Sequence, residues 1–303
     1  MIIRNILDEL NVIYDCNQKE VEVATLGLAN ADLDYGYCTF LEDKKYLDTL
    51  SPYASVILTK DSLRKDLEEK GKVAIVVQEP RISFFKMHNA LINNPDYVRK
   101  QFQTTIGDNC EISETAVIAD NNVTIGSNVI IEDFVVIKEN TVIKDDCILR
   151  TGTIIGGEGF EHKRTAGSDI LSVKHLGGVI IEKGVELQQS NCVDKAIYPW
   201  DDTVIGEYTK TDNCVHIAHA DKLGKRVFIA ACACLSGRVS VGNDVWIGPG
   251  VTIINGISIG NNAKISIGSV VTKEVQADTR VTGNFAVEHK KFMNFIKKLA
   301  TGK

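Results

Sequence analysis

The sequence lacks the features that mark several common classes of protein. Only 7% of its 303 residues are aromatic and only five are proline, which suits a core of small aliphatic side chains. The net charge is −6, so the excess of Lys and Arg that neutralises phosphates in nucleic-acid-binding proteins is missing. No run approaches the roughly 18 apolar residues of a transmembrane helix. We therefore expect no nucleic-acid partner and no membrane span.

The cysteines and the first residues bear on the cellular compartment. The eight cysteines include no CxxC pair and no zinc-site spacing. A chain of this length can build its core without disulfides, so we expect reduced thiols. The opening stretch MIIRNILDEL carries a charge at Arg4 and lacks the apolar core and cleavage site of a signal peptide. The sequence thus predicts a cytoplasmic protein with no bound metal or cofactor.

Aliphatic residues recur at every sixth position over most of the chain. The first series ends in an unbroken run at Ile125, Ile131, Ile137, Ile143, Leu149 and Ile155. After a break from about Gly156 to Gly178, a ladder of 16 positions runs from Ile181 to Val271, and 14 of these are Val, Ile or Leu. Its two exceptions are Pro199 and Thr211.

A period of six fits neither an α-helix nor an ordinary strand, which repeat at about 3.6 and 2 residues. Each hexad can form one short strand and one turn, and three hexads can form an 18-residue coil of a triangular prism with the ladder residues inside. Turns such as Ile125-Gly126-Ser127-Asn128 place Gly and Asn after the ladder residue, and both tolerate positive φ. We therefore predict a mainly β protein with a parallel β-helix of hexapeptide repeats over residues 101–280.

The regions on either side lack the hexad. Residues 1–100 read as a small α/β domain, with strands expected at Glu20–Leu26, Ala54–Leu58 and Val73–Val77 and a helix at Ser83–Ile92. Residues 281–303 form a C-terminal segment with an amphipathic helix expected at 288–299. The basic face of this helix is either a solubilising surface or a dock for an acidic carrier or for coenzyme phosphates.

The densest polar segment of the β-helix runs from Asn213 to His219. Steps of 18 residues place Asp201, His219 and Gly237 in one column. A carboxylate can fix the tautomer of a histidine base, and a glycine N–H can stabilise an oxyanion, which are the groups that acyl transfer to an amine needs. The alternative is an ordinary surface histidine. His216 and His219 leave from different positions of the coil, so we expect no shared metal.

Two excursions interrupt the ladder, one at Gly156–Gly178 and one at Ile197–Trp200. Each could cover a binding face, since insertions in solenoids often do, or form a plain surface loop.

With these motifs in view, the chain resembles the UDP-3-O-(3-hydroxyacyl)glucosamine N-acyltransferases of lipid A biosynthesis. The likeness rests on segments at 36–46, 157–160, 177–181, 201–206 and 216–219. It implies a left-handed β-helix and a homotrimer with sites between neighbouring subunits. It also implies His219 as general base and the Gly237 N–H as oxyanion donor.

The same resemblance implies a nucleotide-sugar substrate. Phe40 and Tyr46 would contact uracil, with Asp43 in the same segment, and Asn213 and His216 are further candidates for substrate binding. The acyl donor in the family is acyl carrier protein. The ending at 282–286 is more similar to sugar acetyltransferases, so acyl-CoA is an alternative donor, and another UDP- or dTDP-amino sugar is an alternative acceptor.

Two readings from other classes stay open. One is a non-catalytic binding or scaffold protein built on a hexapeptide prism. The other is a carbonic-anhydrase-like hexapeptide protein, which would need three histidines that converge on zinc between subunits.

Overall fold

The computed structural model describes residues 1–18, 22–283 and 286–301. Glu20 of the first expected strand, and Asn284 and Phe285 of the segment at 282–286, therefore lie outside the described residues. The chain forms two compact units. The α/β unit comprises residues 1–103, 158–178 and 195–202, and the β-helix unit comprises residues 104–157, 179–194 and 203–303.

The α/β unit contains a five-stranded sheet with the strand order β1-β5-β4-β3-β2. Strands β2 to β5 run parallel, and β1 is antiparallel to β5. The strands are β1 (Tyr14–Asp15), β2 (Thr25–Leu26), β3 (Tyr37–Leu41), β4 (Ala54–Thr59) and β5 (Val73–Val77). The helices are α1 (Ile3–Glu9), η1 (Lys44–Thr49), α2 (Asp61–Glu69), α3 (Pro80–Ala90) and η2 (Leu91–Asn93). Strand β3 and helix α2 are elements that the sequence did not predict.

Helices cover both faces of this sheet. Leu63 and Leu67 of α2 pack with Ile57 of β4, whereas Phe84 of α3 packs with Leu58, the next residue along the same strand. Successive residues of a strand point to opposite faces, so the two helices lie on opposite sides. Burial of alternate residues by two helices explains why β4 and β5 are almost wholly aliphatic.

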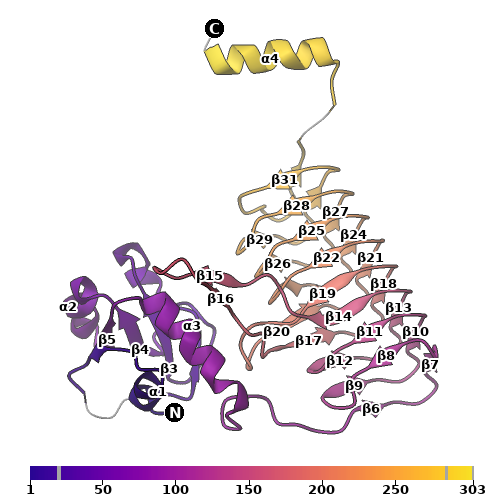
Figure 1. Ribbon diagram of the computed structural model, residues 1–303. Helices are drawn as coiled ribbons and strands as arrows, with labels where there is room; N and C mark the ends of the chain where they lie inside the picture. Colours follow the sequence, from indigo (N-terminus) through magenta and orange to yellow (C-terminus); the bar gives the residue numbers. More distant parts are fainter. Residues whose placement is uncertain (19–21, 284–285, 302–303) are drawn as a thin grey trace. The chain divides into compact units, whose positions relative to one another are not determined.

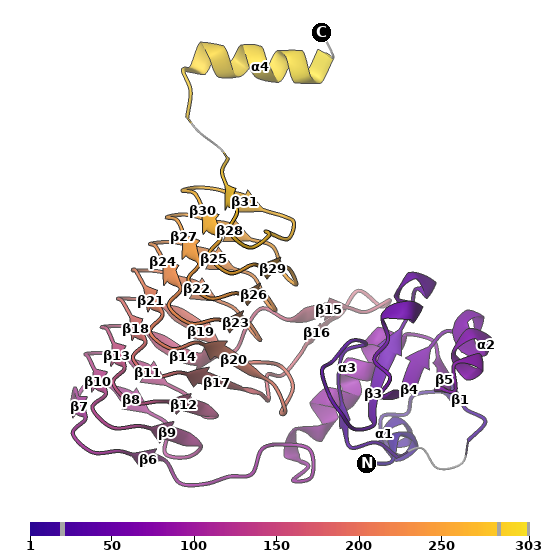
Figure 2. The same cartoon turned by 180° about the vertical axis from the view of Figure 1, so that it is seen from behind.

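Both excursions from the ladder fold with the α/β unit. The first carries a hairpin of β15 (His162–Arg164) and β16 (Ile170–Ser172), and Figure 2 shows it extending away from the coils. Asn89 of α3 anchors it, donating to the Ser172 carbonyl at 2.8 Å and accepting the Lys174 N–H at 3.0 Å. In the second, Trp200 stacks on Tyr198 and donates its indole N–H to the Leu26 carbonyl at 2.8 Å.

The β-helix has three parallel sheets, which are the three faces of a prism, and Figure 1 shows their strands stacked coil upon coil. Face 1 holds β6 (Thr105–Ile106), β9 (Val123–Ile125), β12 (Thr141–Ile143), β17 (Gly178–Ile181), β20 (Asp202–Ile205), β23 (Lys222–Leu223), β26 (Ser240–Val241) and β29 (Ser258–Ile259). Face 2 holds β7 (Glu111–Ile112), β10 (Ile130–Ile131), β13 (Ile148–Leu149), β18 (Glu186–Leu187), β21 (Lys210–Thr211), β24 (Phe228–Ile229), β27 (Trp246–Ile247), β30 (Lys264–Ile265) and β32 (Arg280–Val281). Face 3 holds β8 (Val117–Ile118), β11 (Val136–Ile137), β14 (Ile154–Gly157), β19 (Cys192–Asp194), β22 (His216–Ile217), β25 (Cys234–Leu235), β28 (Thr252–Ile253) and β31 (Val270–Val271). The predicted left-handed parallel β-helix with a small N-terminal α/β region and a C-terminal helix is confirmed.

The ladder residues fill the centre of the prism, as predicted. From Ile125 onward they are buried and form one continuous aliphatic cluster, to which Thr211 adds its buried side chain. The prediction is wrong at Pro199, which lies in the excursion at 195–202 and not in a coil. Partners on face 2 reveal this insertion, because Ile130 pairs with Ile148 at a spacing of 18 whereas Glu186 pairs with Lys210 at a spacing of 24.

The turns use Gly and Asn for two different reasons. Asn128 adopts the positive φ of 57° that was expected of turn residues. Gly126 does not, and its role is close approach, since a Cβ there would lie 2.7 Å from the Asp145 backbone nitrogen of the next coil. The glycine directly after a ladder residue is therefore required by stacking between coils and not by φ.

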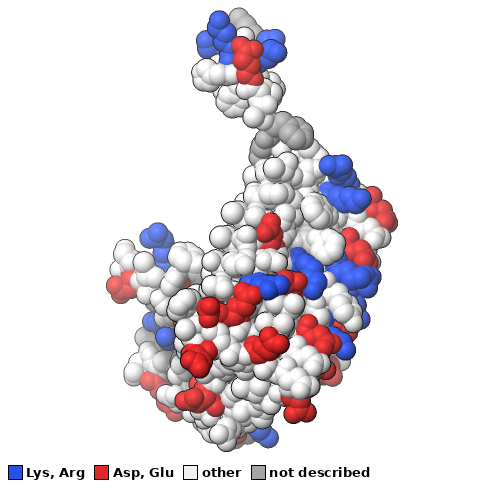
Figure 3. Space-filling view, turned by 90° about the vertical axis from the view of Figure 1, so that its right-hand side faces the viewer, with Lys and Arg blue, Asp and Glu red and all other residues white. Residues whose placement is uncertain are grey.

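The predicted C-terminal helix is present as α4 (His289–Thr301). It carries exposed Phe292, Phe295 and Ile296 along one side, with lysines between them. Among the described residues, no helix is both long enough and apolar enough to cross a membrane. Figure 3 shows acidic and basic side chains next to one another on the side of the coils that it faces.

Candidate active site

His219 lies at the corner between faces 3 and 1, just after β22. The residue is only 9% exposed, and its ring lies against the backbone of the next coil at Gly237. A Cβ on Gly237 would be 2.5 Å from His219 Cε1 and 2.6 Å from Nε2, so any larger residue would displace the imidazole. The Gly237 N–H donates no hydrogen bond within the described part of the chain, which leaves it available to a ligand.

Two buried side chains fix this corner. Asp221, which is fully buried, accepts the Ala218 N–H at 3.0 Å and the Val239 N–H at 2.8 Å. It thereby ties the residue before His219 to the second residue after Gly237. Burial raises the pKa of the Asp221 carboxyl well above its usual range, while the two N–H donors oppose that rise.

Thr203 supports the same corner from the preceding coil. Its hydroxyl accepts the Ala220 N–H at 2.8 Å and donates to the Asp194 carbonyl at 2.6 Å. Thr203 and Asp221 therefore hold the turn that carries His219 through backbone groups on both sides of it. Neither residue was singled out from the sequence, although both lie on the 18-residue register of Val239.

The carboxylate that the coils place in this region is Asp194, and its partner is His216. His216 Nε2 lies 3.0 Å from Asp194 Oδ2, and His216 Nδ1 lies 3.7 Å from Cys234 Sγ in the next coil. The hydrogen bond to Asp194 raises the pKa of His216, and partial burial opposes that rise. Sequence reasoning missed Asp194 because it carried the 18-residue step across an excursion, where the register Cys192↔His216 spans 24 residues.

Asp201 belongs to the α/β unit, whereas His219 belongs to the β-helix unit. Within its own unit, Asp201 accepts the Asp202 N–H on its carboxylate at 2.9 Å, and its carbonyl accepts from Arg99 at 2.8 Å. The expected pairing of Asp201 with His219 stays a prediction.

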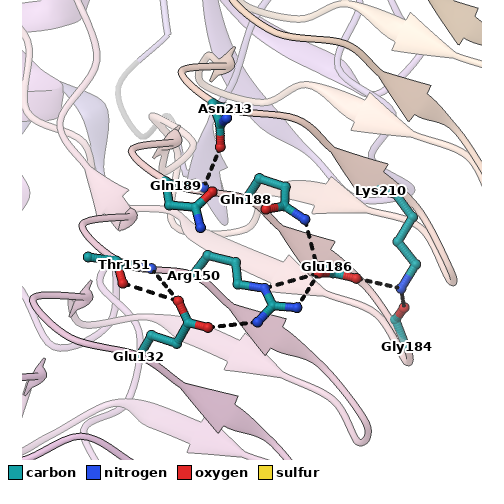
Figure 4. A network of polar contacts seen from close by, with 9 residues as sticks. All are labelled: Glu132, Arg150, Thr151, Gly184, Glu186, Gln188, Gln189, Lys210 and Asn213. Carbon is teal, nitrogen blue, oxygen red and sulfur yellow. Dashed lines mark hydrogen bonds and ion pairs between the residues drawn. The ribbon is translucent and has the colours of Figure 1, made fainter.

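Asn213 lies one corner away from His219, between faces 2 and 3. Its amide oxygen accepts the Gln189 N–H at 3.1 Å, which joins two neighbouring coils. Figure 4 shows it beside an ion-pair network on face 2 in which Arg150 contacts Glu132 and Glu186, each at 2.7 Å. The contacts that the structure gives for Asn213 are thus contacts between coils.

The three residues expected to bind uracil lie at the end of β3 and in η1. The Phe40 ring packs 5.1 Å from that of Phe84 in the core beside α3. Asp43 accepts the Lys45 N–H at 3.0 Å as the N-cap of η1 and forms an ion pair with Lys45, and these contacts lower the pKa of its carboxyl. Tyr46 is half exposed, with the Lys45 ammonium 4.8 Å from its ring centre.

No group of three or more His, Cys, Asp or Glu side chains in the described residues is arranged to hold a metal ion. The chemistry on offer is instead that of a histidine base beside a free backbone N–H, with a second histidine polarised by a carboxylate. This is the equipment for proton transfer next to a developing oxyanion.

Comparison with known proteins identifies the family. The model of the bacterial transferase hexapeptide (six repeats) matches residues 122–157 and 238–273. The UDP-3-O-acylglucosamine N-acyltransferase of Helicobacter pylori is 36% identical over 230 residues, which cover 69% of this chain and 67% of that protein. The chain belongs to the UDP-3-O-acylglucosamine N-acyltransferase family.

Other members of the N-acyltransferase family match over shorter stretches. The Wolinella succinogenes enzyme is 32% identical over 143 residues, which are 47% of this chain and 44% of that protein. The chain thus spans less than half the length of the first curated relatives that it matches.

Solved structures agree on the fold. A UDP-N-acetylglucosamine acyltransferase from Arabidopsis has a TM-score of 0.54 at 23% identity and covers 60% of this chain and 62% of that one. The UDP-N-acetylglucosamine acyltransferase from Campylobacter jejuni has a TM-score of 0.52 at 18% identity and covers 65% and 79% of the two chains. At these identities the likeness establishes the left-handed β-helix alone.

Proposed function

We propose that the protein is an N-acyltransferase that moves an acyl group from a thioester to the amine of a UDP-linked 3-O-acylglucosamine. The observation that carries this proposal is the contact between the His219 ring and Gly237, whose N–H has no partner in the described residues. Family membership supplies the substrate class.

In the proposed reaction, the amine nitrogen of the sugar attacks the carbonyl carbon of the thioester while His219 removes a proton from that nitrogen. The oxyanion that forms accepts a hydrogen bond from the Gly237 N–H. When the tetrahedral intermediate collapses, the carbon–sulfur bond breaks and the thiolate leaves with the proton that His219 held. A donor and a base aligned before the reaction lower the barrier because nothing has to reorganise.

The donor is proposed to be acyl carrier protein, with acyl-CoA as the alternative. Face 3 presents exposed aliphatic side chains beyond the site, Ile254 and Val270, which are suited to contact with an acyl chain. We also propose that the active form is a homotrimer in which a neighbouring prism closes the site. The half-exposed side chain of His216, beside the buried His219, supports a site that one chain leaves open.

Nucleotide contacts by Phe40, Asp43 and Tyr46, substrate contacts by Asn213 and His216, and support of His219 by Asp201 are part of the same proposal. A cytoplasmic location remains the expectation from the sequence.

The deciding experiment replaces the base. His219→Gln keeps the size and polarity of the side chain and is expected to lower kcat by about 10³-fold, the usual contribution of a general base. Products from UDP-amino sugars with acyl carrier protein and acyl-CoA donors are measured by mass. Lys225→Ala, at an exposed ion pair on another corner, is the matched control and should retain activity. Full transfer by His219→Gln would refute the mechanism.

A further inference from the structure

The α/β unit contains a cavity of about 480 Å³ that lies away from the β-helix residues described above. It is lined by Glu42, Lys60 and Gln78, each of which directly follows a strand of the parallel sheet, β3, β4 and β5 respectively. The cavity therefore opens at the carboxyl edge of three adjacent parallel strands. In open α/β sheets, this edge is where ligands bind.

Cationic side chains dominate the lining. Lys60, Arg81 and Arg164 line the cavity, and none of them forms an ion pair with any residue that the structure describes. The two carboxylates of the lining are used elsewhere, because Glu42 accepts the Arg81 N–H at 3.4 Å and Glu79 accepts the Ala166 N–H at 2.9 Å. Three cations that share a concave surface without counterions favour an anionic ligand.

Two helices begin at this cavity. Lys60 is the N-cap of α2 and Glu79 is the N-cap of α3, and both caps lack a side-chain hydrogen bond to the helix. The helices lie on opposite faces of the sheet, so their N-terminal N–H groups flank the edge from both sides. The positive ends of the two helix dipoles add to the field of the three cations.

The hairpin β15–β16 closes the third side. It contributes His162, Lys163 and Arg164 to the lining, and the Ala166 N–H bond to Glu79 ties its turn to the start of α3. Lys163 is paired with Glu161 and lies 4.9 Å from the Phe85 ring centre, so it is fixed in the wall. An excursion that leaves the β-helix thus completes a cavity in the α/β unit.

From these residues we infer that the cavity binds the diphosphate group of a nucleotide. A single phosphate would not fill the volume, which is in the range of pockets for small organic ligands. Arg81 and Arg164 can each grip phosphate oxygens with two N–H groups. The choice of phosphate rests on the cations, whereas the choice of a nucleotide rests on the proposed function.

The test is calorimetric titration of the full chain with UDP, uridine and inorganic pyrophosphate at low salt. Wild-type protein should bind UDP and pyrophosphate and bind uridine much more weakly. The Arg81→Gln/Arg164→Gln variant should bind UDP about 100-fold more weakly, since each charge-assisted hydrogen bond contributes about tenfold or more. Arg81→Lys should recover part of the affinity because it restores the charge without the fork.

The matched control is Lys65→Gln/Arg226→Gln, which removes the same charge from exposed ion pairs outside the cavity and should leave UDP affinity unchanged. Equal affinity for UDP and uridine, or UDP affinity unaltered in Arg81→Gln/Arg164→Gln, would overturn the inference. Binding of pyrophosphate without binding of UDP would also overturn it. Loss of transfer in His219→Gln with UDP binding intact would separate this site from the reaction, so the two proposals can fail independently.

Discussion

The β-helix and the α/β unit differ in how far apart in the sequence their contacting residues lie. In the regular coils every residue pairs with residues 18 positions before and after it, as Ser240 does with Lys222 and Ser258. The α/β unit instead joins residues 1–103 to segments at 158–178 and 195–202. The difference teaches that a repeat makes a structure legible from the sequence, whereas contacts that span a hundred residues or more do not follow any local pattern.

The two units also differ in what they offer to a ligand. The β-helix presents a histidine against a bare glycine backbone on an otherwise aliphatic and neutral scaffold. The α/β unit presents a cavity lined by unpaired cations. Proton transfer would therefore belong to the β-helix, and electrostatic recognition of an anion would belong to the α/β unit.

The sharpest test of the β-helix side of this comparison is Gly237→Ala. The added Cβ would lie 2.5 Å from His219 Cε1 and must push the ring away, so kcat is expected to fall by about 100-fold or more. Transfer assays should show this loss while the melting temperature changes little. Gly167→Ala, whose Cβ would meet nothing closer than 3.9 Å, is the control. Wild-type activity in Gly237→Ala would mean that the contact is not part of the site.

A change next to the site should affect stability rather than chemistry alone. Asp221→Ala would leave the buried Ala218 and Val239 N–H groups without their acceptor, and we expect a loss of about 3 kcal/mol in the free energy of unfolding. Urea titration measures the loss. Asp244→Ala removes an exposed carboxylate in an ion pair with Arg226 and should cost less than about 1 kcal/mol. Equal costs for the two variants would show that burial of Asp221 does not matter.

A smaller effect is expected where the α/β unit gathers its distant segments. Arg99 donates to the carbonyls of Pro199 and Asp201, each at 2.8 Å, and forms an ion pair with Asp202 at 2.7 Å. Arg99→Ala should loosen residues 195–202 at a cost of about 1–2 kcal/mol. Faster hydrogen exchange in this segment, with unchanged exchange in the regular coils, is the expected result. Uniform changes in both units would contradict their separation.

The smallest effect is electrostatic. The hydrogen bond to Asp194 raises the pKa of His216, so this pair stabilises the fold below the ordinary histidine pKa of about 6.5, and its contribution is lost as pH rises through the raised value. Asp194→Asn should lower the pKa of His216 and remove this pH dependence, as NMR titration of the ring and urea unfolding at two pH values would show. Asp244→Asn should leave His216 unchanged. An unaltered His216 titration in Asp194→Asn would disprove the assignment.

The sequence by itself determined the β-helix, because each ladder residue reports its own position through its spacing of six from the next. The same spacing aligned His219 with Gly237, since no excursion lies between them. It failed at Pro199, where a six-residue insertion kept the numerical period while the chain left the prism.

Only the tertiary structure decided what lies beside the site and where the excursions go. Asp194 reaches His216 across a register of 24 residues, which no fixed period predicts. Arg164 joins Lys60 and Arg81 at one cavity because the hairpin folds onto α3 through side-chain contacts with backbone groups. Contacts of this kind depend on geometry in three dimensions, and residue type and spacing along the chain carry no trace of them.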